Sequence, residues 1–468
     1  MDDRLRLPEY SDPNPEAPMQ AALRFARHVV ALRWSDLPAA AIDRAKTFLL
    51  DSLGVGLAGA TAPGAAAVRA AAAGWGRGTE AGIWGTTIRL PAPAAALVNG
   101  FQLHCQEYDC LHEAAVLHPM ATLLPASLAY AERAGGVTGR DFLLALAAGV
   151  DVAVNLGLAA TAGLRFFRPA TAGGFGACAA IGRLAGFDAP TLASAFGLLY
   201  AQTSGTMQPH VEGSLALPLQ PGCNARAALE ACDLAGVGLT GPLGVIDGPY
   251  GYLTLFEGSW DLAPIWPTLG QRFRIAELSH KPYPAGRATH GGIEGVALLQ
   301  AAHGFTADQV ASVTVRAPPL IRRLVGRPAL PDPSPAYARL CMGYAMARQL
   351  LTGGVDPTDF RAPVLTDPAT YALAARVVTD DDGGSDPNAL IPQLISVTLT
   401  DARSYATDIA RMRAHPDRPL SREEHLAKFR RCCALAATPI DPEPLIAAVD
   451  RLETLTDLRD LAALLVPG

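Results

Sequence analysis

Apolar residues recur every three or four positions through most of the first 260 residues, the pattern of helices that bury one face. In the predicted helix 41–53, Ile42, Ala45 and Phe48 share such a face. The same pattern predicts further helices over 118–133, 173–185, 190–203 and 222–236. The segment 205–222 lacks it, and we expect a long non-helical connection there.

The pattern changes near residue 266. Short β-branched or alternating segments predict strands over 272–277, 311–316 and 394–400. Helices are predicted over 289–303 and 369–378, and the acidic, glycine-rich segment 379–388 is expected to be an exposed turn. Helices return over 421–435 and 443–452, and the first of these begins with a Ser421/Glu424 capping box.

This order of elements predicts a mainly α fold in which a smaller α+β domain is inserted into a large all-helical domain. The helical domain would comprise residues 1–267 and be completed by 409–468. The inserted domain would comprise residues 268–408.

Composition narrows the possible partners. The net charge of −6 favours neither nucleic acid nor an anionic membrane as a partner. The apolar stretch 142–160 is interrupted by Gly149, Asp151 and Asn155, so we expect a core helix and no membrane span. Half of the residues are apolar and only 18% are charged, which suggests a subunit interface and a homodimer.

The cysteines and the N-terminal residues 1–18 predict the cellular compartment of the protein. None of the eight cysteines forms a CxxC pair, as expected for free thiols in a reducing environment. The acidic, proline-rich residues 1–18 do not resemble a secretory signal. We therefore expect a cytoplasmic protein.

The segment HCQEYDCLHEAAVLHP gathers acids and imidazoles between two predicted helices: His104, Glu107, Asp109, His112 and His118. Groups of these types can move a proton next to a carboxylate. His118 precedes Pro119 at a helix start, where it could act as a base of lowered pKa or simply cap the helix. No HExxH or other tight ligand spacing is present, so we predict no metal.

Two further segments contain candidate ligands for a substrate. In FFRPATAGG, Arg168 precedes a glycine-rich helix start and could hold a carboxylate, or it could pair with an acid. In the connection 205–222, Met207, Gln208 and His210 could line a site, although the segment could also only pack over the helices below it.

The segment SHKPYPAGRATHGG places Lys281, Arg287 and His290 in a turn that leads into a helix. Two cations and an imidazole beside a helix N-terminus would bind a di- or tricarboxylate. The alternative is an ordinary surface turn.

The chain resembles the MmgE/PrpD family. The spans HCQEYD…HP, PASLAYAERAGGVTGRDFLLALAAGVDV, GSLALPLQPGCNARAALEACDLAGVGLTGP and LSHKPYPAGRATHGGIEG follow the family pattern in order, over roughly residues 20–460. The family contains 2-methylcitrate dehydratase, cis-aconitate decarboxylase and an iminodisuccinate epimerase. The resemblance implies a large helical domain, an α+β lid domain, homodimers, and a site between the domains that needs no cofactor.

Carried over residue by residue, the resemblance places the first two of the family's three acids at Glu107 and Asp109. The third acid is replaced by Cys110. It also matches the functional positions of His118, Lys281, His290 and Tyr344.

Three positions depart from the family pattern. Arg168 stands where the dehydratase and decarboxylase members have a histidine, Leu217 where they have a lysine, and Gly286 where the decarboxylase has a histidine. The guanidinium of Arg168 removes a titratable base and adds a permanent carboxylate binder, whereas Leu217 removes a cation and makes that wall apolar. A substrate with one carboxylate fewer than methylcitrate or cis-aconitate, or with an apolar group in its place, would suit Leu217 better.

The leading hypothesis is therefore a cofactor-independent lyase that removes a proton from a small carboxylic acid and expels water or CO2. His118 would be the acid or base, tuned by Glu107 or Asp109, with His290 and Tyr344 as proton donors. The predicted substrate-binding residues are Arg168, Lys281, Arg287, Gln208, His210 and His112. The alternatives are an isomerase or epimerase of a small acid, and a relative that binds small acids without catalysis.

Overall fold

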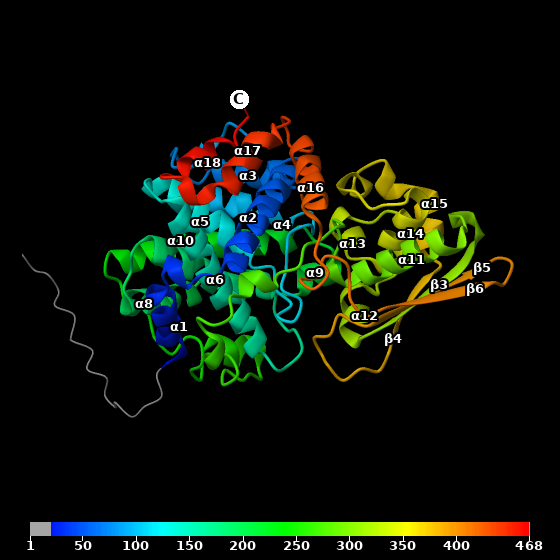
Figure 1. Ribbon diagram of the computed structural model, residues 1–468, viewed down its shortest axis with the longest axis horizontal. Coiled ribbons are helices and arrows are strands. Elements are labelled where there is room, and N and C mark those ends of the chain that lie inside the picture. Colours follow the sequence, from blue (N-terminus) through cyan, green and yellow to red (C-terminus); the bar gives the residue numbers. More distant parts are fainter. Residues whose placement is uncertain (1–19, 468) are drawn as a thin grey trace, which may run out of the picture.

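The computed structural model describes residues 20–467, which form mainly helices, as predicted. Figure 1 shows a large helical body and a smaller body that carries the four-stranded sheet. The helices of the large body are α1 (Ala21–Ala31), α2 (Ala39–Gly59), α3 (Ala65–Ala73), α4 (Ala92–His104), α5 (Met120–Ala134), α6 (Gly139–Ala159), α7 (Arg168–Leu184), α8 (Ala189–Tyr200), α9 (Gln208–Glu212), α10 (Ala216–Gly236), α16 (Arg422–Ala434), α17 (Pro442–Asp450) and α18 (Arg459–Ala463).

The helices α4 and α10 pack closely against each other. A Cβ added at Gly100 would lie 2.7 Å from the Cα of Gly222, so only glycine allows these backbones to approach so closely. The two-stranded hairpin of β1 (Ala81–Gly82) and β2 (Arg89–Leu90) lies at the start of α4. The helix α6 is long and apolar enough to cross a membrane, but its most apolar window is 94% buried inside the protein.

The smaller body is built on a sheet with the strand order β4-β3-β5-β6. Its strands are β3 (Val310–Ala317), β4 (Val377–Asp381), β5 (Gln393–Leu399) and β6 (Ser404–Ile409). The strand β3 pairs in parallel with β4 and antiparallel with β5, so that Val313 lies between Val377 and Val397. The helices of this body are α11 (His290–His303), α12 (Pro319–Val325), α13 (Pro335–Arg339), α14 (Met342–Thr352) and α15 (Pro368–Ala374).

Two hydrophobic cores follow this division. The larger core contains apolar side chains from Ala21 to Leu278 and again from Phe429 to Leu465. The smaller core contains side chains between Ala288 and Met412, mostly from the sheet and from α11 and α14. The C-terminal helices return to the first core, with α16 against α2. The larger core extends past residue 268 to Leu278 and the smaller core past residue 408 to Met412, so the expected boundaries at 268 and 408 stay a prediction.

Several predicted elements are confirmed. The strands predicted over 311–316 and 394–400 correspond to β3 and β5, because their β-branched alternation suits a half-buried sheet. The Ser421 hydroxyl accepts a hydrogen bond from the Glu424 N–H, and the Glu424 carboxylate accepts one from the Ser421 N–H. The predicted capping box is therefore present at the start of α16.

Other predictions are wrong. The strand expected over 272–277 is a 3₁₀ turn, Arg274–Glu277, since its arginine and glutamate bind side chains and no neighbouring strand. The helix expected over 369–378 ends at Ala374, and β4 occupies part of the expected acidic turn. The connection 205–222 contains α9 and the first turns of α10, which tolerates Pro221 inside the helix.

Candidate active site

A cavity of about 70 Å³ is bounded by both bodies of the molecule. This is several times the roughly 10–15 Å³ that one water needs by the same measure. Four ionisable side chains face it: Glu107, His118, His210 and Arg287. The rest of the wall is largely apolar and consists of Leu111, Val116, Leu164, Phe167, Pro169, Met207, Gly286, Ala288, Leu324, Val325, Leu340 and Leu390.

One carboxylate orients two imidazoles at the edge of this cavity. The Oδ2 atom of Asp109 lies 3.1 Å from Nδ1 of His118 and 3.0 Å from Nδ1 of His104. Burial opposes ionisation of Asp109, but the two histidines hold the pKa of its carboxyl well below the usual range. The ionised carboxylate can only accept, so each imidazole turns an Nδ1–H toward it. This leaves Nε2 of His118 as a free acceptor on a cavity-lining side chain.

The two histidines differ in basicity. Burial lowers the pKa of His118, and the nearby ammonium of Lys281 lowers it further. Burial also acts on His104, but the charges of Asp109 and Glu107 outweigh it and raise the pKa of that imidazole. His118 is therefore the one of the pair that the structure keeps neutral, as a general base requires.

Glu107 also lines the cavity, with Oε1 3.5 Å from His104 Nε2, and it is paired with the lysine of the predicted turn. Lys281 Nζ lies 2.7 Å from Glu107 Oε2 and donates to the Glu107 carbonyl oxygen at 3.1 Å. Burial opposes ionisation of Glu107, but Lys281 and the histidines lower the pKa of its carboxyl to about 2. The backbone of Glu107 is left-handed, with φ of 50°, and so is that of Val116, with φ of 49°. Such backbone strain is rare outside glycine and concentrates at functional sites.

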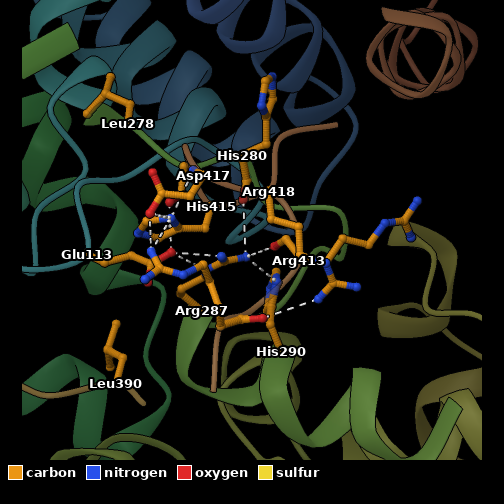
Figure 2. Close-up of polar contacts among 12 residues, drawn as sticks. Glu113, Leu278, His280, Arg287, His290, Leu390, Arg413, His415, Asp417 and Arg418 are labelled. Carbon is orange, nitrogen blue, oxygen red and sulfur yellow. Dashed lines mark hydrogen bonds and ion pairs between the residues drawn. The ribbon is translucent and has the colours of Figure 1, made fainter. Parts of the chain in front are cut away.

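Arg287 faces the cavity, yet other groups of the protein already accept its hydrogen bonds. Its Nε and Nη2 atoms donate to Glu113 Oε1 at 3.0 and 2.7 Å. Its Nη1 atom donates to the carbonyl oxygens of Arg413, at 2.9 Å, and His280, at 3.3 Å. Figure 2 shows these contacts converging on Arg287, with His290 beside it. The guanidinium is thus neutralised before any substrate carboxylate arrives.

Arg168 does not reach the cavity, and this corrects its predicted role in binding a substrate. Its side chain is fully buried and donates to both carboxylate oxygens of Glu257 at 2.8 to 3.0 Å. It also donates to the Ala115 carbonyl oxygen, and the Tyr252 hydroxyl donates to Glu257 at 2.6 Å. The alternative interpretation, an arginine paired with an acid, describes this position.

Two predicted proton donors also lie away from the cavity. Nε2 of His290 lies 3.1 Å from the Ala285 carbonyl oxygen, and its Nδ1 lies 3.3 Å from Arg287 Nη1. The Tyr344 hydroxyl donates to the Asp359 carbonyl oxygen at 2.6 Å. Both side chains are buried and hydrogen-bonded to backbone, so the structure corrects their predicted contact with a substrate.

Of the remaining predicted substrate ligands, His112, Gln208 and His210, some line the cavity and others do not. His112 bridges Glu277 Oε2, at 3.1 Å, and the Ala115 N–H, so it supports the loop and does not line the cavity. Gln208 is exposed and bonded to Glu212, which corrects its predicted role. Of the three, only His210 lines the cavity. Burial, followed by the charge of Arg327, lowers the pKa of His210 to about 4.

Apolar packing replaces two of the family's polar side chains. Leu217 is buried against Phe167, Ala170 and Leu340. A Cβ at Gly286 would lie 2.8 Å from Leu340 Cδ2, so Leu340 occupies the space that a side chain at position 286 would use. Gly286 and Leu340 line the cavity, and Leu217 packs against two lining residues, Phe167 and Leu340.

Among residues 20–467, two groups of side chains could hold a metal ion by spacing alone: His104, Asp109 and His118, and the buried trio Asp51, His280 and His425. In the second group Lys428 Nζ lies 2.7 Å from Asp51 Oδ1, and its charge would oppose a bound cation. In the first group both imidazoles bind Asp109 through Nδ1 at hydrogen-bond distance, which suits proton transfer.

The buried histidines predict acid sensitivity. Burial lowers the pKa of His280 and His290 well below 6.5, that of His210 to about 4 and that of His425 to about 3. Between pH 6.5 and 4 the unfolded chain therefore binds more protons than the folded one, and stability is lost as the pH falls. His104, whose pKa is raised, acts in the opposite sense, as do the carboxyls of Asp51, Glu132 and Asp151, whose pKa values burial raises.

We expect urea titrations between pH 7 and 4.5 to show the free energy of unfolding falling by up to about 1.4 kcal/mol per pH unit for each such histidine. Replacing His425 with glutamine should remove the contribution of one histidine to this dependence of the unfolding free energy on pH. A free energy that stays level over this range would contradict the burial of neutral imidazoles.

Sequence reasoning did not single out the acids that neutralise the cations. Glu113 lies inside the 104–119 cluster, but nothing in its spacing shows that it contacts Arg287, 174 residues away. Glu257 lies in an apolar stretch, where a lone acid indicates a buried partner without identifying it as Arg168. Arg327, which donates to the His210 carbonyl oxygen at 2.9 Å, belongs to no motif.

Comparison with known proteins agrees with this architecture. Residues 23–264 match the MmgE/PrpD N-terminal domain, and residues 283–454 match the MmgE/PrpD C-terminal domain. The chain is 29% identical, over 97% of its length and 98% of the relative, to the cis-aconitate decarboxylase-like protein oryM of Aspergillus oryzae. It is 27% identical to the cis-aconitate decarboxylases of Mus musculus and Homo sapiens, over 94% of its length and 92% and 93% of theirs. The chain therefore belongs to the MmgE/PrpD family.

Proposed function

We propose that this protein is a lyase that acts on a small carboxylic acid, with His118 as the group that moves the proton. The observation that carries this proposal is the pair of imidazoles held by Asp109 at the edge of an apolar cavity. Membership of a family with decarboxylase relatives supports the reaction class.

In the proposed first step, Nε2 of neutral His118 removes a proton from the carbon next to the substrate's carboxylate or carbonyl group. The C–H electron pair moves into that group, and the new N–H positive charge is balanced by Asp109, which lies 3.1 Å from Nδ1. Departure of hydroxide from the neighbouring carbon, taken up with a proton as water, would complete a dehydration. In a decarboxylation the C–C bond to a carboxylate would break in place of the C–H bond. Its electron pair stays on the substrate carbon as CO2 leaves, and a proton taken up from water and delivered through His118 then forms the new C–H bond.

The apolar wall contributes to this chemistry by excluding water. Phe167, Leu340 and Leu390 face the cavity from both bodies of the molecule. A low local dielectric strengthens the interaction between the imidazolium and Asp109, which favours proton removal from a weak carbon acid.

A panel of unsaturated and hydroxylated C4–C7 acids, incubated with the purified protein in deuterated water and followed by NMR, tests the proposal. We expect at least one acid to lose water or CO2 and to incorporate deuterium at the adjacent carbon. Deuterium exchange without elimination would instead support the isomerase or epimerase hypothesis. Binding without exchange or elimination would support the non-catalytic one.

A further inference from the structure

His210 lies where the two bodies of the molecule meet. It belongs to α9 of the larger body, and the segment 327–337 of the smaller body contacts this helix. Nη2 of Arg327 donates to the His210 carbonyl oxygen at 2.9 Å, and the Ser334 hydroxyl donates to the Gly213 carbonyl oxygen at 2.7 Å. The smaller body therefore holds α9, and with it His210, against the cavity that both bodies bound.

The guanidinium of Arg327 holds the ring of His210 in one tautomer. Nη2 of Arg327 lies 3.3 Å from Nδ1 of His210, and the same Nη2 lies 2.9 and 3.2 Å from the carbonyl oxygens of His210 and Leu324. A guanidinium can only donate, so a hydrogen on Nδ1 would point at the hydrogens of Nη2. Nδ1 therefore carries a lone pair, and the hydrogen of the neutral ring lies on Nε2.

The imidazole of His210 is uncharged at neutral pH. Burial, followed by the charge of Arg327, lowers the pKa of the ring to about 4, although Glu107 acts in the opposite sense. The guanidinium of Arg327 lies 4.8 Å from the centre of the Tyr337 ring, and this contact holds the cation in place beside His210. The ring of His210 is thus an N–H donor without a net charge.

His118 offers the opposite tautomer to the same cavity. Asp109 accepts the hydrogen on Nδ1 of His118, so that Nε2 of His118 is an acceptor. Within residues 20–467, Nε2 of neither histidine bonds to another group of the protein, and neither atom is fully buried. Both side chains line the cavity. It therefore contains one imidazole that can take up a proton and one that can donate a hydrogen bond.

We propose that His210 is a second catalytic residue, whose Nε2–H donates a hydrogen bond to the substrate oxygen that becomes negative when His118 removes the proton. The inference rests on the proposed function, because that proton transfer identifies the oxygen as part of the carbonyl or carboxylate group beside the reacting carbon. The electron pair of the broken C–H bond moves into this group, and His210 keeps its own proton. The hydrogen bond strengthens as the charge develops, which lowers the barrier.

A neutral donor suits this cavity because the cations near it are already paired. Lys281 is bound to Glu107, and Arg287 is bound to Glu113. An imidazole N–H without net charge binds a resting substrate only weakly and responds mainly to the negative charge that the reaction adds. The largely apolar wall strengthens this response, because a low local dielectric screens the new charge little.

Nitrogen-15 NMR of protein labelled in its histidines tests the tautomer without any turnover. The signals of His210 are those lost in His210→Gln. His303→Gln is the matched control, since His303 is exposed at the end of α11. We expect the ring of His210 to be neutral at pH 7 with its hydrogen on Nε2. A ring that carries its hydrogen on Nδ1, or that is positively charged at pH 7, would overturn the proposal.

Steady-state kinetics on an acid that the wild-type protein converts tests the catalytic role. His210→Leu removes the donor, and we expect kcat to fall by about 10²–10³-fold while KM changes far less. His210→Gln keeps an N–H donor and should recover part of this loss, and His303→Gln should keep the wild-type kcat. His210→Ala takes the place of His210→Leu should that variant fail to fold. Wild-type kcat without the donor, or a change in KM alone, would overturn the assignment.

The two proposals fail in different ways. If elimination proceeds at the wild-type rate in His210→Leu, the lyase proposal stands and the role of His210 fails. If no acid is converted, crotonate and fumarate at millimolar concentration serve as probes of the labelled protein. A shift of the His210 Nε2–H signal on binding would support the hydrogen bond, although the lyase proposal fails. A probe that moves the signals of His118 but not those of His210, or that moves neither, would overturn the role of His210.

Discussion

Replacement of His118 by glutamine should lower kcat by about 10²–10⁴-fold while the affinity for the acid stays near that of the wild-type protein. Glutamine keeps a hydrogen-bonding side chain of similar length but cannot take up a proton at neutral pH. The site would still bind the substrate, since His118 contributes none of the positive charge that holds a carboxylate.

The measurement is steady-state kinetics and deuterium exchange on whichever acid the wild-type protein converts. Asp109→Asn serves as the companion variant. An amide can donate to the His118 ring, so it no longer fixes the Nδ1–H tautomer, and we expect kcat to fall by a similar factor. His112→Gln is the control, since His112 contacts Glu277 and not the cavity. Wild-type kcat in the His118 variant would contradict the assignment of the base.

The second large effect concerns stability. Arg168→Met should lower the free energy of unfolding by about 3–5 kcal/mol, because it leaves the Glu257 carboxylate buried without a counter-charge. The carboxylate would retain only the hydroxyl of Tyr252. Urea unfolding followed by circular dichroism, together with Tm, measures the loss.

Two controls separate this effect from a general loss of packing. The double variant Arg168→Met with Glu257→Gln should recover part of the loss, because the unpaired charge is gone. Arg133→Met removes a more exposed partner of Asp233, and its cost should stay under about 1 kcal/mol. If Arg168→Met were instead as stable as the wild-type protein but bound acids weakly, Arg168 would act as the sequence first suggested.

The correction at Arg168 shows where residue types by themselves are ambiguous. An arginine before a glycine-rich helix start can bind a ligand or an internal acid, and both interpretations use the same guanidinium chemistry. The difference lies in Glu257, 89 positions away, whose oxygens come within 2.8 Å. The roles of Lys281 and Arg287 likewise depend on distant acids, because each is neutralised by an acid 174 positions away.

Helices, strands and helix caps were predictable because they depend on residues that are close together in the sequence. Hydrophobic spacing predicted the helices, β-branched alternation predicted β3 and β5, and the Ser421/Glu424 pair predicted the start of α16. Each depends on neighbours a few positions apart. The strand expected at 272–277 was wrong because Arg274 binds Asn155, 119 positions away, as well as Thr268 and Glu277, and these polar contacts override a short β-like pattern.

By itself the sequence determined the mainly helical architecture, the family and the segment that contains Glu107, Asp109 and His118. These depend on local periodicity and on motifs whose residues lie close together in the chain. Only the tertiary structure decided which charges are neutralised. Coulombic pairing acts through space, so it neutralises Lys281, Arg287 and Arg168 with distant acids.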